Sequence, residues 1–304
     1  MKKKFLILSV LALLLILAGS IYFYKARLIT TTKKYFNIAN TLKKENPSNV
    51  DNPNQKTDLR KNFQDNFNKN QTIEEVENIS ESKDADWWVN SGAFFYQKNG
   101  IASTVLGELA DAYWQKLYNE NDPGETDNGL YPQNIFRLVT KTKWQNLQQE
   151  AYFRVIKDNL SSDSHRAASN GLLLFNRYQD GNNLYYTGVR VDGTAVIKKK
   201  INGNYYTMAQ KPFFEDTYNR DNNPNLLPKN QWIGVKSEVK NGQNGSVSIK
   251  VFIDNGKTGN WTLALETQDD GKSFGGQSIM DEGYAGIRTD FMDVEFSNYK
   301  ISEL

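Results

Sequence analysis

The feature that most constrains the fold is the stretch 170–203, in which Asx-Gly dipeptides bound short runs of apolar residues. Asp180-Gly181 and Asp192-Gly193 separate the runs, and Asn202-Gly203 closes the stretch. Such pairs are the strongest short-range hairpin signal, because both central residues of a type I′ turn need a positive φ. The stretch therefore predicts three consecutive antiparallel strands.

The middle strand of this stretch has two different faces, because side chains alternate with a period of two along a strand. One face carries Val189 and Val191 and is expected to belong to the core. The other carries Tyr186, Gly188 and Arg190. A tyrosine and an arginine on either side of a glycine indicate a face on which something flat and polar could lie.

Turn signals of the same kind continue to the C-terminus, at Asn241-Gly242, Asn244-Gly245, Asn255-Gly256 and Asp270-Gly271. Many short strands at regular spacing predict an all-β fold, a sandwich, jelly roll or barrel, rather than βαβ units. The only helix expected in the globular part covers residues 105–117. In that segment Leu106, Leu109 and Trp114 belong to one apolar stripe.

The composition excludes several kinds of site. The chain has no cysteine, which excludes disulfides, thiolate metal sites, a cysteine nucleophile and a lipoprotein anchor. The single histidine, His165, excludes a His-rich zinc site and leaves only one residue on which a Ser-His-Asp triad could be built. The net charge of +2 gives no overall field that would attract nucleic acid, so electrostatic recognition has to come from a local patch.

The N-terminal segment indicates export. Three lysines at positions 2 to 4 precede the uncharged run 5–24, which at about 1.5 Å per residue is just long enough to cross a bilayer core. We expect residues 1–24 to be a signal anchor, or alternatively a signal peptide cleaved near Gly19. The rest of the chain is then extracytoplasmic, in a single-pass protein of the cell membrane or in a secreted one.

Residues 25–84 are rich in Asn, Lys, Gln and Glu and poor in large apolar side chains. Such a composition buries too little apolar surface to offset chain entropy, so we expect a polar linker that is largely disordered. The density of aromatic residues rises at Trp87 and Trp88. The sequence therefore places the globular domain at residues 85–304.

The order of elements in this domain resembles the concanavalin A-like (laminin G-like) jelly-roll superfamily. The segments that carry the resemblance are DWWVNSGAFFYQKNGIAS (86–103), the aromatic and Asx-Gly stretch 175–203, NQWIGVKSEVKNG (230–242), SVSIKVFIDNG (246–256) and GYAGIRTDFMDVEFSNYKI (283–301). The resemblance implies an antiparallel β-sandwich. It also implies a glycan-binding or glycan-cleaving groove across one sheet, because the superfamily includes sugar-binding modules, glycoside hydrolases and polysaccharide lyases.

The residues restrict which enzyme this could be. A retaining hydrolase of this fold would need an E-x-D-x-x-E strand with two carboxylates about 5 to 5.5 Å apart, and the chain has none. A lyase acting on an acidic polysaccharide would need a cation or amide beside the uronate carboxylate, and a Tyr or His to move protons. The candidates for proton transfer are His165 and Tyr186, although the alginate-lyase-like R-x-E-x-R and Q-x-H strands are absent.

The candidates for ligand binding are polar and aromatic residues of the predicted strands: Arg137, Arg154, Arg177, Tyr186, Arg190 and Trp232. The expected function is that of a membrane-tethered, monomeric protein that binds a polysaccharide or cell-surface glycan along an Arg/Tyr-lined sheet face. One alternative is a polysaccharide lyase or another glycan-cleaving enzyme. The other is a structural or protein-adhesion module, in which outward Arg and Tyr side chains only stabilise neighbouring strands, at about 0.2–1 kcal/mol per pair.

Calcium is the one cofactor that the resemblance implies. Jelly rolls of this kind often hold a structural calcium ion with oxygen ligands from the first and last strands. Asp290 and Asp293 lie in the closing strand, where such ligands are expected. Carboxylate oxygens suit Ca²⁺, and the spacing is not that of an EF-hand loop.

Overall fold

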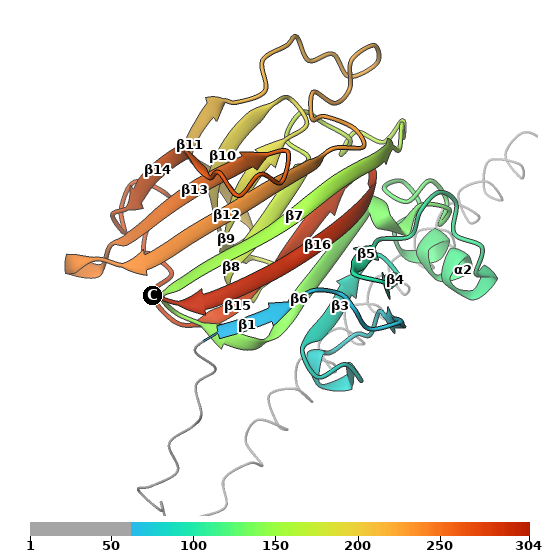
Figure 1. Cartoon of the computed structure of the whole chain (residues 1–304), viewed down its shortest axis with the longest axis horizontal. Coiled ribbons are helices and arrows are strands. Elements are labelled where there is room, and N and C mark those ends of the chain that lie inside the picture. Colours follow the sequence, from blue (N-terminus) through green and yellow to red (C-terminus); the bar gives the residue numbers. More distant parts are fainter. Residues whose placement is uncertain (1–61) are drawn as a thin grey trace, which may run out of the picture. The chain divides into compact units, whose positions relative to one another are not determined.

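The computed structural model describes residues 62–304, which form two antiparallel sheets packed face to face (Figure 1). The all-β sandwich expected from the sequence is confirmed. The expected membrane segment, 1–24, and most of the expected linker lie outside the described residues. No helix within residues 62–304 has the length and apolar character needed to cross a membrane.

The first sheet has nine strands. Their order is β14 (Thr262–Asp269), β13 (Val247–Asn255), β12 (Trp232–Asn241), β7 (Leu147–Asp158), β16 (Met292–Glu303), β5 (Ile101–Ser103), β4 (Phe94–Lys98) and β2 (Gln71–Glu74), with β1 (Asn62–Asp65) also paired to β16. The last strand in the sequence, β16, therefore lies in the interior of this sheet.

The second sheet has seven strands. Their order is β11 (Asn204–Pro212), β10 (Thr194–Ile201), β9 (Asn183–Arg190), β8 (Gly171–Asp180), β15 (Gly283–Asp290), β6 (Ile135–Trp144) and β3 (Trp87–Ser91). Strands β8, β9 and β10 are the three antiparallel strands predicted from the Asx-Gly dipeptides. Asn202 and Gly203, which join β10 to β11, have φ values of 50° and 80°, as a type I′ turn requires. Asp180, Gly181 and Asp192 do not have a positive φ in this range, so the type I′ geometry expected at the other two dipeptides is wrong although the hairpins form there.

A hydrogen-bonded polar network crosses the apolar core between the two sheets. Asn176 of β8 accepts from Ser237 Oγ of β12 at 2.8 Å and from Gln149 Nε2 of β7 at 2.8 Å. It donates to Thr187 Oγ1 of β9 at 3.0 Å, and Tyr299 of β16 donates to Gln149 Oε1 at 2.9 Å. All five side chains are buried. Because each of these buried polar groups needs its hydrogen-bond partner, the network fixes the position of one sheet relative to the other.

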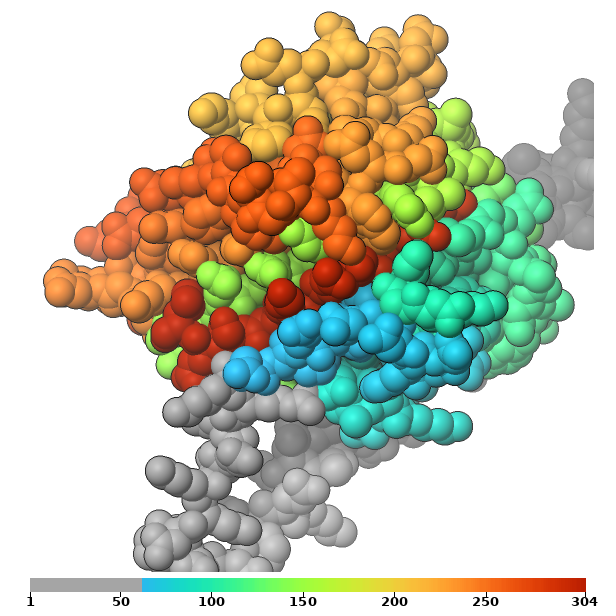
Figure 2. All heavy atoms as spheres, in the orientation of Figure 1, coloured from blue at the N-terminus to red at the C-terminus, as the bar shows by residue number. Residues whose placement is uncertain are grey.

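The sheet begins at Asn62, well before the domain boundary expected near residue 85. Strand β1 pairs with β16 and β2 pairs with β4, and Figure 2 shows this first part of the domain, in blue, packed beside the red C-terminal strand. Phe67 is fully buried, and its ring lies 5.6 Å from that of Phe95 in an edge-on contact. A few spaced apolar residues thus anchor a segment that is polar on average.

The helix begins later than the segment 105–117 expected from the apolar stripe. It is α2, Ala112–Asn121, and Asp111 caps it by accepting from the backbone N–H groups of Tyr113 and Trp114. Leu109 precedes the cap, in a loop, and still packs in the same apolar cluster as Trp114. Three short 3-10 turns complete the elements: η1 (Ile79–Glu81), η2 (Pro132–Asn134) and η3 (Gln243–Gly245).

Candidate ligand-binding face

The outer face of the seven-stranded sheet carries its own apolar cluster. Along each strand these side chains alternate with the core residues, so they point away from the nine-stranded sheet. The cluster consists of Trp88, Val139, Leu173, Phe175, Tyr178, Leu184, Tyr186 and Val196, all buried. The face therefore has an apolar and aromatic floor.

Two arginines lie opposite one another on this floor. Arg137 of β6 and Arg288 of β15 are direct cross-strand partners, an arrangement in which like charges destabilise a sheet. Arg288 Nε donates to Asp290 Oδ1 at 2.6 Å, and Arg288 also donates to the Tyr186 hydroxyl at 3.2 Å. Arg137 forms no hydrogen bond or ion pair with any residue of the described part of the chain. Of the two guanidinium groups, only that of Arg288 pairs with a carboxylate within residues 62–304.

A third cation, Lys198 of β10, lies directly opposite Tyr186. It is half-buried and likewise has no hydrogen bond or ion pair among residues 62–304. Burial, together with repulsion from Arg190 and Arg288, lowers the pKa of Lys198. Within the described part of the chain this half-buried ammonium group therefore lacks the ion-pair partner that a buried charge usually has.

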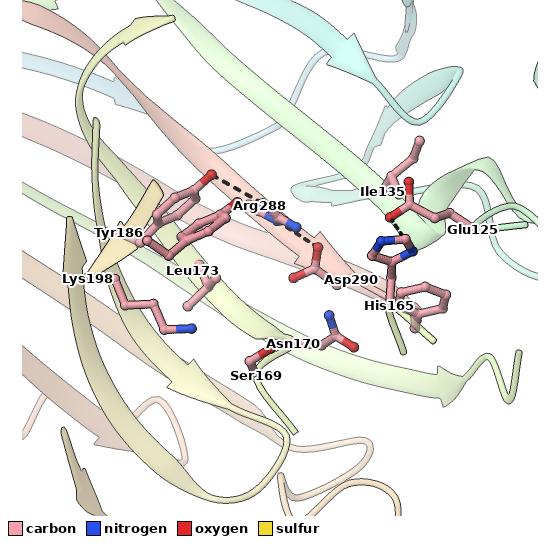
Figure 3. Close-up of a pocket in the computed structure, with 12 residues that line it drawn as sticks. Glu125, Ile135, His165, Ser169, Asn170, Leu173, Tyr186, Lys198, Arg288 and Asp290 are labelled. Carbon is pink, nitrogen blue, oxygen red and sulfur yellow. Dashed lines mark hydrogen bonds and ion pairs between the residues drawn. The ribbon is translucent and has the colours of Figure 1, made fainter. Parts of the chain in front are cut away.

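A pocket of about 320 Å³ opens between these groups, and Figure 3 shows its wall. It is lined by Glu125, Ile135, His165, Ser169, Asn170, Leu173, Tyr186, Lys198, Tyr205, Arg288, Asp290 and Phe291. Arg288 lies between the Tyr186 hydroxyl and Asp290, whereas His165 and Glu125 face each other at the far end. The volume is in the range of sites for small ligands.

Two tyrosines of the pocket wall differ in their acidity. The rings of Tyr186 and Tyr205 lie 5.9 Å apart, and Tyr186 is 4% exposed whereas Tyr205 is 51% exposed. Burial raises the pKa of Tyr186 to about 12. Burial also opposes ionisation of Tyr205, but the positive charges of Arg288 and Lys200 outweigh it and lower the pKa of that phenol. The two neighbouring phenols therefore differ in acidity, and Tyr205 is the more acidic of the two.

His165 stands on a loop at the pocket rim. Its Nδ1 atom lies 2.8 Å from Asp163 Oδ1 and 3.6 Å from Glu125 Oε1. The backbone N–H of His165 donates to the same Asp163 oxygen, and this contact is the main cause of the lowered pKa of Asp163. The imidazole is thus oriented by two carboxylates.

The structure brings some of the sequence-predicted residues together. Arg137, Tyr186 and Arg190 lie on the outer face of the seven-stranded sheet, and His165 lies at the end of its pocket. Arg190 donates to Asp192 Oδ2 at 2.5 Å and to the Ala168 carbonyl at 3.1 Å, so its charge is already paired.

The other predicted binding residues lie elsewhere. Arg154 and Trp232 belong to the nine-stranded sheet, where the guanidinium group stacks 4.6 Å from the indole ring and pairs with Glu295. Arg177 is fully buried and donates to the carbonyls of Gln145 and Ile279, both at 2.7 Å. Burial lowers the pKa of Arg177 to about 10. These three residues do not share the pocket.

Sequence reasoning missed Arg288, Lys198 and Tyr205 as a group. The register of the β9–β10 hairpin places Lys198 opposite Tyr186, and this position could have been read from the Asp192-Gly193 turn. The position of Arg288 could not be predicted from a local turn, because β15 pairs with β6 and β8, which are distant in the sequence.

The two aspartates expected to bind calcium have different surroundings. Asp290 pairs with Arg288. The buried carboxylate of Asp293 accepts from Gly107 N at 2.7 Å, Gln133 Nε2 at 2.8 Å and Asn159 Nδ2 at 3.0 Å. Gln133 Oε1 and Asn159 Oδ1 are buried and have no hydrogen-bond partner in the range 62–304. No group of three or more His, Cys, Asp or Glu residues that could hold a metal occurs in the described range.

Comparison with known proteins finds similarity only among solved structures: neither a protein-family model nor a curated protein sequence matches the chain. The carbohydrate-binding module CBM66 from Bacillus subtilis is 15% identical, with 56% of this chain and 83% of that one covered and a TM-score of 0.40. The Ca²⁺-bound exoplasmic/lumenal domain of VIP36 is 8% identical, with 79% and 92% covered and a TM-score of 0.41. A Bacillus licheniformis β-glucanase is 10% identical, with 80% and 98% covered and a TM-score of 0.41.

The two-sheet antiparallel sandwich of residues 62–304 agrees with the architecture that the sequence resemblance implies. With TM-scores of 0.40 and 0.41, these matches add no argument about the role of this chain.

Proposed function

We propose that the outer face of the seven-stranded sheet binds an acidic glycan, with Arg137, Arg288 and Lys198 receiving its anionic groups. The observation that carries the proposal is the position of Arg137 directly opposite Arg288, where Asp290 pairs with Arg288 and Arg137 has no carboxylate partner in the described range. Such a pair is unfavourable in the free protein and becomes favourable when an anion lies between the two guanidinium groups.

The surroundings favour a sugar over a simple anion. The half-exposed ring of Tyr205 offers an aromatic surface at the pocket wall, and Asn170 and Ser169 add hydrogen-bonding groups beside it. An apolar body with a few placed polar groups is typical of sites that bind small organic ligands. An aromatic ring and a cation together suit a sugar ring that carries a carboxylate or sulfate.

Binding assays on the full-length protein test the proposal. We expect acidic oligosaccharides to bind in calorimetry, and Arg137→Gln or Lys198→Gln to weaken binding by about tenfold or more, since hydrogen bonds to charged groups contribute about 1.5–3 kcal/mol. The matched control is Lys240→Gln, which removes an exposed lysine of β12 on the other sheet. Equal affinity for neutral and acidic glycans, or no effect of either substitution, would contradict the proposal.

A polysaccharide lyase is the second candidate function, and the unequal acidity of Tyr186 and Tyr205 favours it. A uronate carboxylate held by Arg288 and Arg137 would make the adjacent C5–H bond more acidic. The Tyr205 phenolate could take this proton, while the C4–O bond breaks, a C4=C5 double bond forms, and the still protonated Tyr186 donates a proton to the leaving oxygen. His165, at the pocket end, would contact the neighbouring sugar.

The lyase reaction has a direct readout, the rise in ultraviolet absorbance of an unsaturated product. The rate should increase with pH as Tyr205 loses its proton, because only the phenolate can accept one. Tyr205→Phe should remove the rate and retain glycan binding. If a glycan binds without any change in absorbance, the lyase function is excluded for that glycan and only the binding function is supported.

We further propose that Asp293 holds a calcium ion together with Gln133 and Asn159. The unpartnered oxygens of these two amides support the proposal, because rotation of each amide would turn an oxygen toward the carboxylate, and Ca²⁺ prefers such ligands. Calcium would then raise the melting temperature of the wild-type protein, and Asp293→Asn would remove the increase. Equal melting with calcium and with a chelator would exclude the site.

We also propose that residues 1–24 tether the domain to the outside of a cell membrane. The support is the lysine-flanked apolar run of the sequence. Protease added to intact cells should digest the domain, and membrane washing at high salt should not release it. Recovery of the protein in the cytosolic fraction would contradict this localisation.

A further inference from the structure

Resting on the proposed function, we infer that the ligand is an extended chain of acidic sugars that crosses the strands of the seven-stranded sheet. Arg137 and Lys198, the two cations of this face without a hydrogen bond or ion pair to residues 62–304, lie on β6 and β10. Between these strands lie β15, β8 and β9. Four strand spacings separate the two cations, on the order of 19 Å. A single sugar ring cannot contact both, whereas an oligosaccharide can.

The floor between the two cations is continuous. Arg137 is opposite Arg288, Arg288 is opposite Leu173, and Lys198 is opposite Tyr186 in the register of the sheet. Phe175 is in turn opposite Tyr186, and its ring lies 5.4 Å from the tyrosine ring. The side chains between the cations are thus apolar or aromatic, apart from Arg288.

The charges along this line favour a repeating anion. Arg288 stands between the two unpaired cations and has Asp290 as its carboxylate partner, and Lys200 stands farther along β10, over the ring of Tyr205 at 4.7 Å. A chain with one anionic group on each sugar would place successive charges near successive cations. Because the cations belong to different strands, the chain has to run across the strands rather than along them.

The length of the ligand then determines its affinity. Contacts at two separate positions, joined by one chain, convert the second contact into an intramolecular event and strengthen binding. Because the contacts are between exposed or half-buried charges, the gain should also diminish as salt is added.

Calorimetry on the full-length protein with a dimer, a tetramer and an octamer of galacturonic acid, and a parallel series of heparin oligosaccharides, tests the inference. We expect the longest oligomer of the acidic series that binds to bind at least about tenfold more tightly than its dimer. Arg137→Gln and Lys198→Gln should each remove most of this gain, whereas Lys240→Gln should retain it. A thymidine octanucleotide, a polyanion without the sugar acid, should bind more weakly.

The outcomes separate the two proposals. If no oligomer of either series binds, the proposed function itself fails. If dimer and octamer bind equally, the glycan site stands and the extended ligand is wrong. If the oligonucleotide binds as tightly as the best glycan, the face recognises polyanions in general and the carbohydrate inference is overturned.

Discussion

At the scale of single residues, Arg137 and Arg288 differ although they are cross-strand partners. Arg288 neutralises the nearly buried Asp290, whereas Arg137 has no such partner in the described part of the chain. The first therefore stabilises the fold, and the second is positioned at the expense of stability. Arg288 therefore stabilises the fold in addition to lining the pocket, whereas Arg137 has an unfavourable cross-strand neighbour at this position.

Substitution of the two arginines should have opposite effects on stability. We expect Arg137→Gln to leave the free energy of unfolding unchanged or to raise it by about 0.2–1 kcal/mol, because a like-charge contact is removed. Arg288→Gln should lower it by about 3 kcal/mol or more, because Asp290 is left buried and unpaired. Urea unfolding of both variants at neutral pH measures the difference. Equal destabilisation by the two changes would mean that Arg137 has a structural partner.

Asp254 should make stability depend on pH. Burial opposes its charge, but hydrogen bonds from Thr258, Gly259 and Tyr152 outweigh burial and lower the pKa of Asp254. A lowered pKa contributes stability above the unfolded value of about 3.9, and this stability is lost as pH falls through the folded value. Asp254→Asn should therefore cost about 1–3 kcal/mol at neutral pH, and the cost should shrink below about pH 4.

Unfolding of the wild type and Asp254→Asn at a series of pH values checks this expectation. The control is Glu266→Gln, which changes an exposed carboxylate of β14 that forms no hydrogen bond or ion pair with the described residues. A cost that is the same at every pH would show that the amide disturbs the site by shape rather than by charge.

Period-two alternation predicts that Lys199 points opposite to Lys198 and Lys200, and the structure confirms it. Lys199 is fully buried and pairs with Asp269 at 2.9 Å, whereas Lys198 is on the outer face. The local sequence predicts the direction of each lysine side chain, but it does not predict that Asp269 is the ion-pair partner of Lys199. Asp269 lies on β14, in the other sheet, so only the packing of the two sheets brings it to Lys199.

At the scale of elements, the start of the domain shows where composition misleads. Residues 62–84 look like linker because polar side chains dominate the average. Strand pairing depends on backbone groups, and anchoring needs only a few apolar side chains. Phe67 and Ile73 meet that need.

Truncation of Phe67 tests this anchoring. We expect Phe67→Ala to lower the free energy of unfolding by about 3–5 kcal/mol, as for a large aromatic side chain removed from a core. In a mobile linker the same change would have no effect. Thermal or urea unfolding distinguishes an anchored segment from a mobile linker. The control is Phe213→Ala, the same substitution at a partly buried position packed against the same core cluster, which should lower the free energy of unfolding by less.

At the scale of the whole molecule, the fold class, the three antiparallel strands β8, β9 and β10 and the positions of the turns were predictable. They depend on local Asx-Gly dipeptides and on the alternation of apolar and polar side chains. The order of strands within each sheet was not predictable, since β7 pairs with β16 and β15 pairs with β6 and β8 across long stretches of chain. The residues of the candidate site likewise divide into those predictable from local sequence and those that depend on the strand order. Tyr186 could be predicted from its own strand, whereas its neighbour Arg288 required the sheet order.

A fragment that starts at residue 85, the boundary indicated by composition, should fold poorly. It would lack β1 and β2 and expose the edge of β4 and the ring of Trp87, whose indole Nε1–H donates to Asp65 in the intact domain. We expect this fragment to melt at a lower temperature than the fragment 62–304 and to aggregate at its exposed edge. Identical melting curves would show that the first two strands are dispensable.

Both sheets have a late strand in their interior. The last strand of the chain, β16, lies between β7 and β5, and β15 lies between β8 and β6. During synthesis the neighbours of β15 and β16 therefore lack a partner at these central positions until residues 283–303 have been made. Local hairpins such as β9–β10 can pair earlier, but the interior of each sheet closes only when these late residues are present, so the half-made domain exposes strand edges that are prone to aggregate.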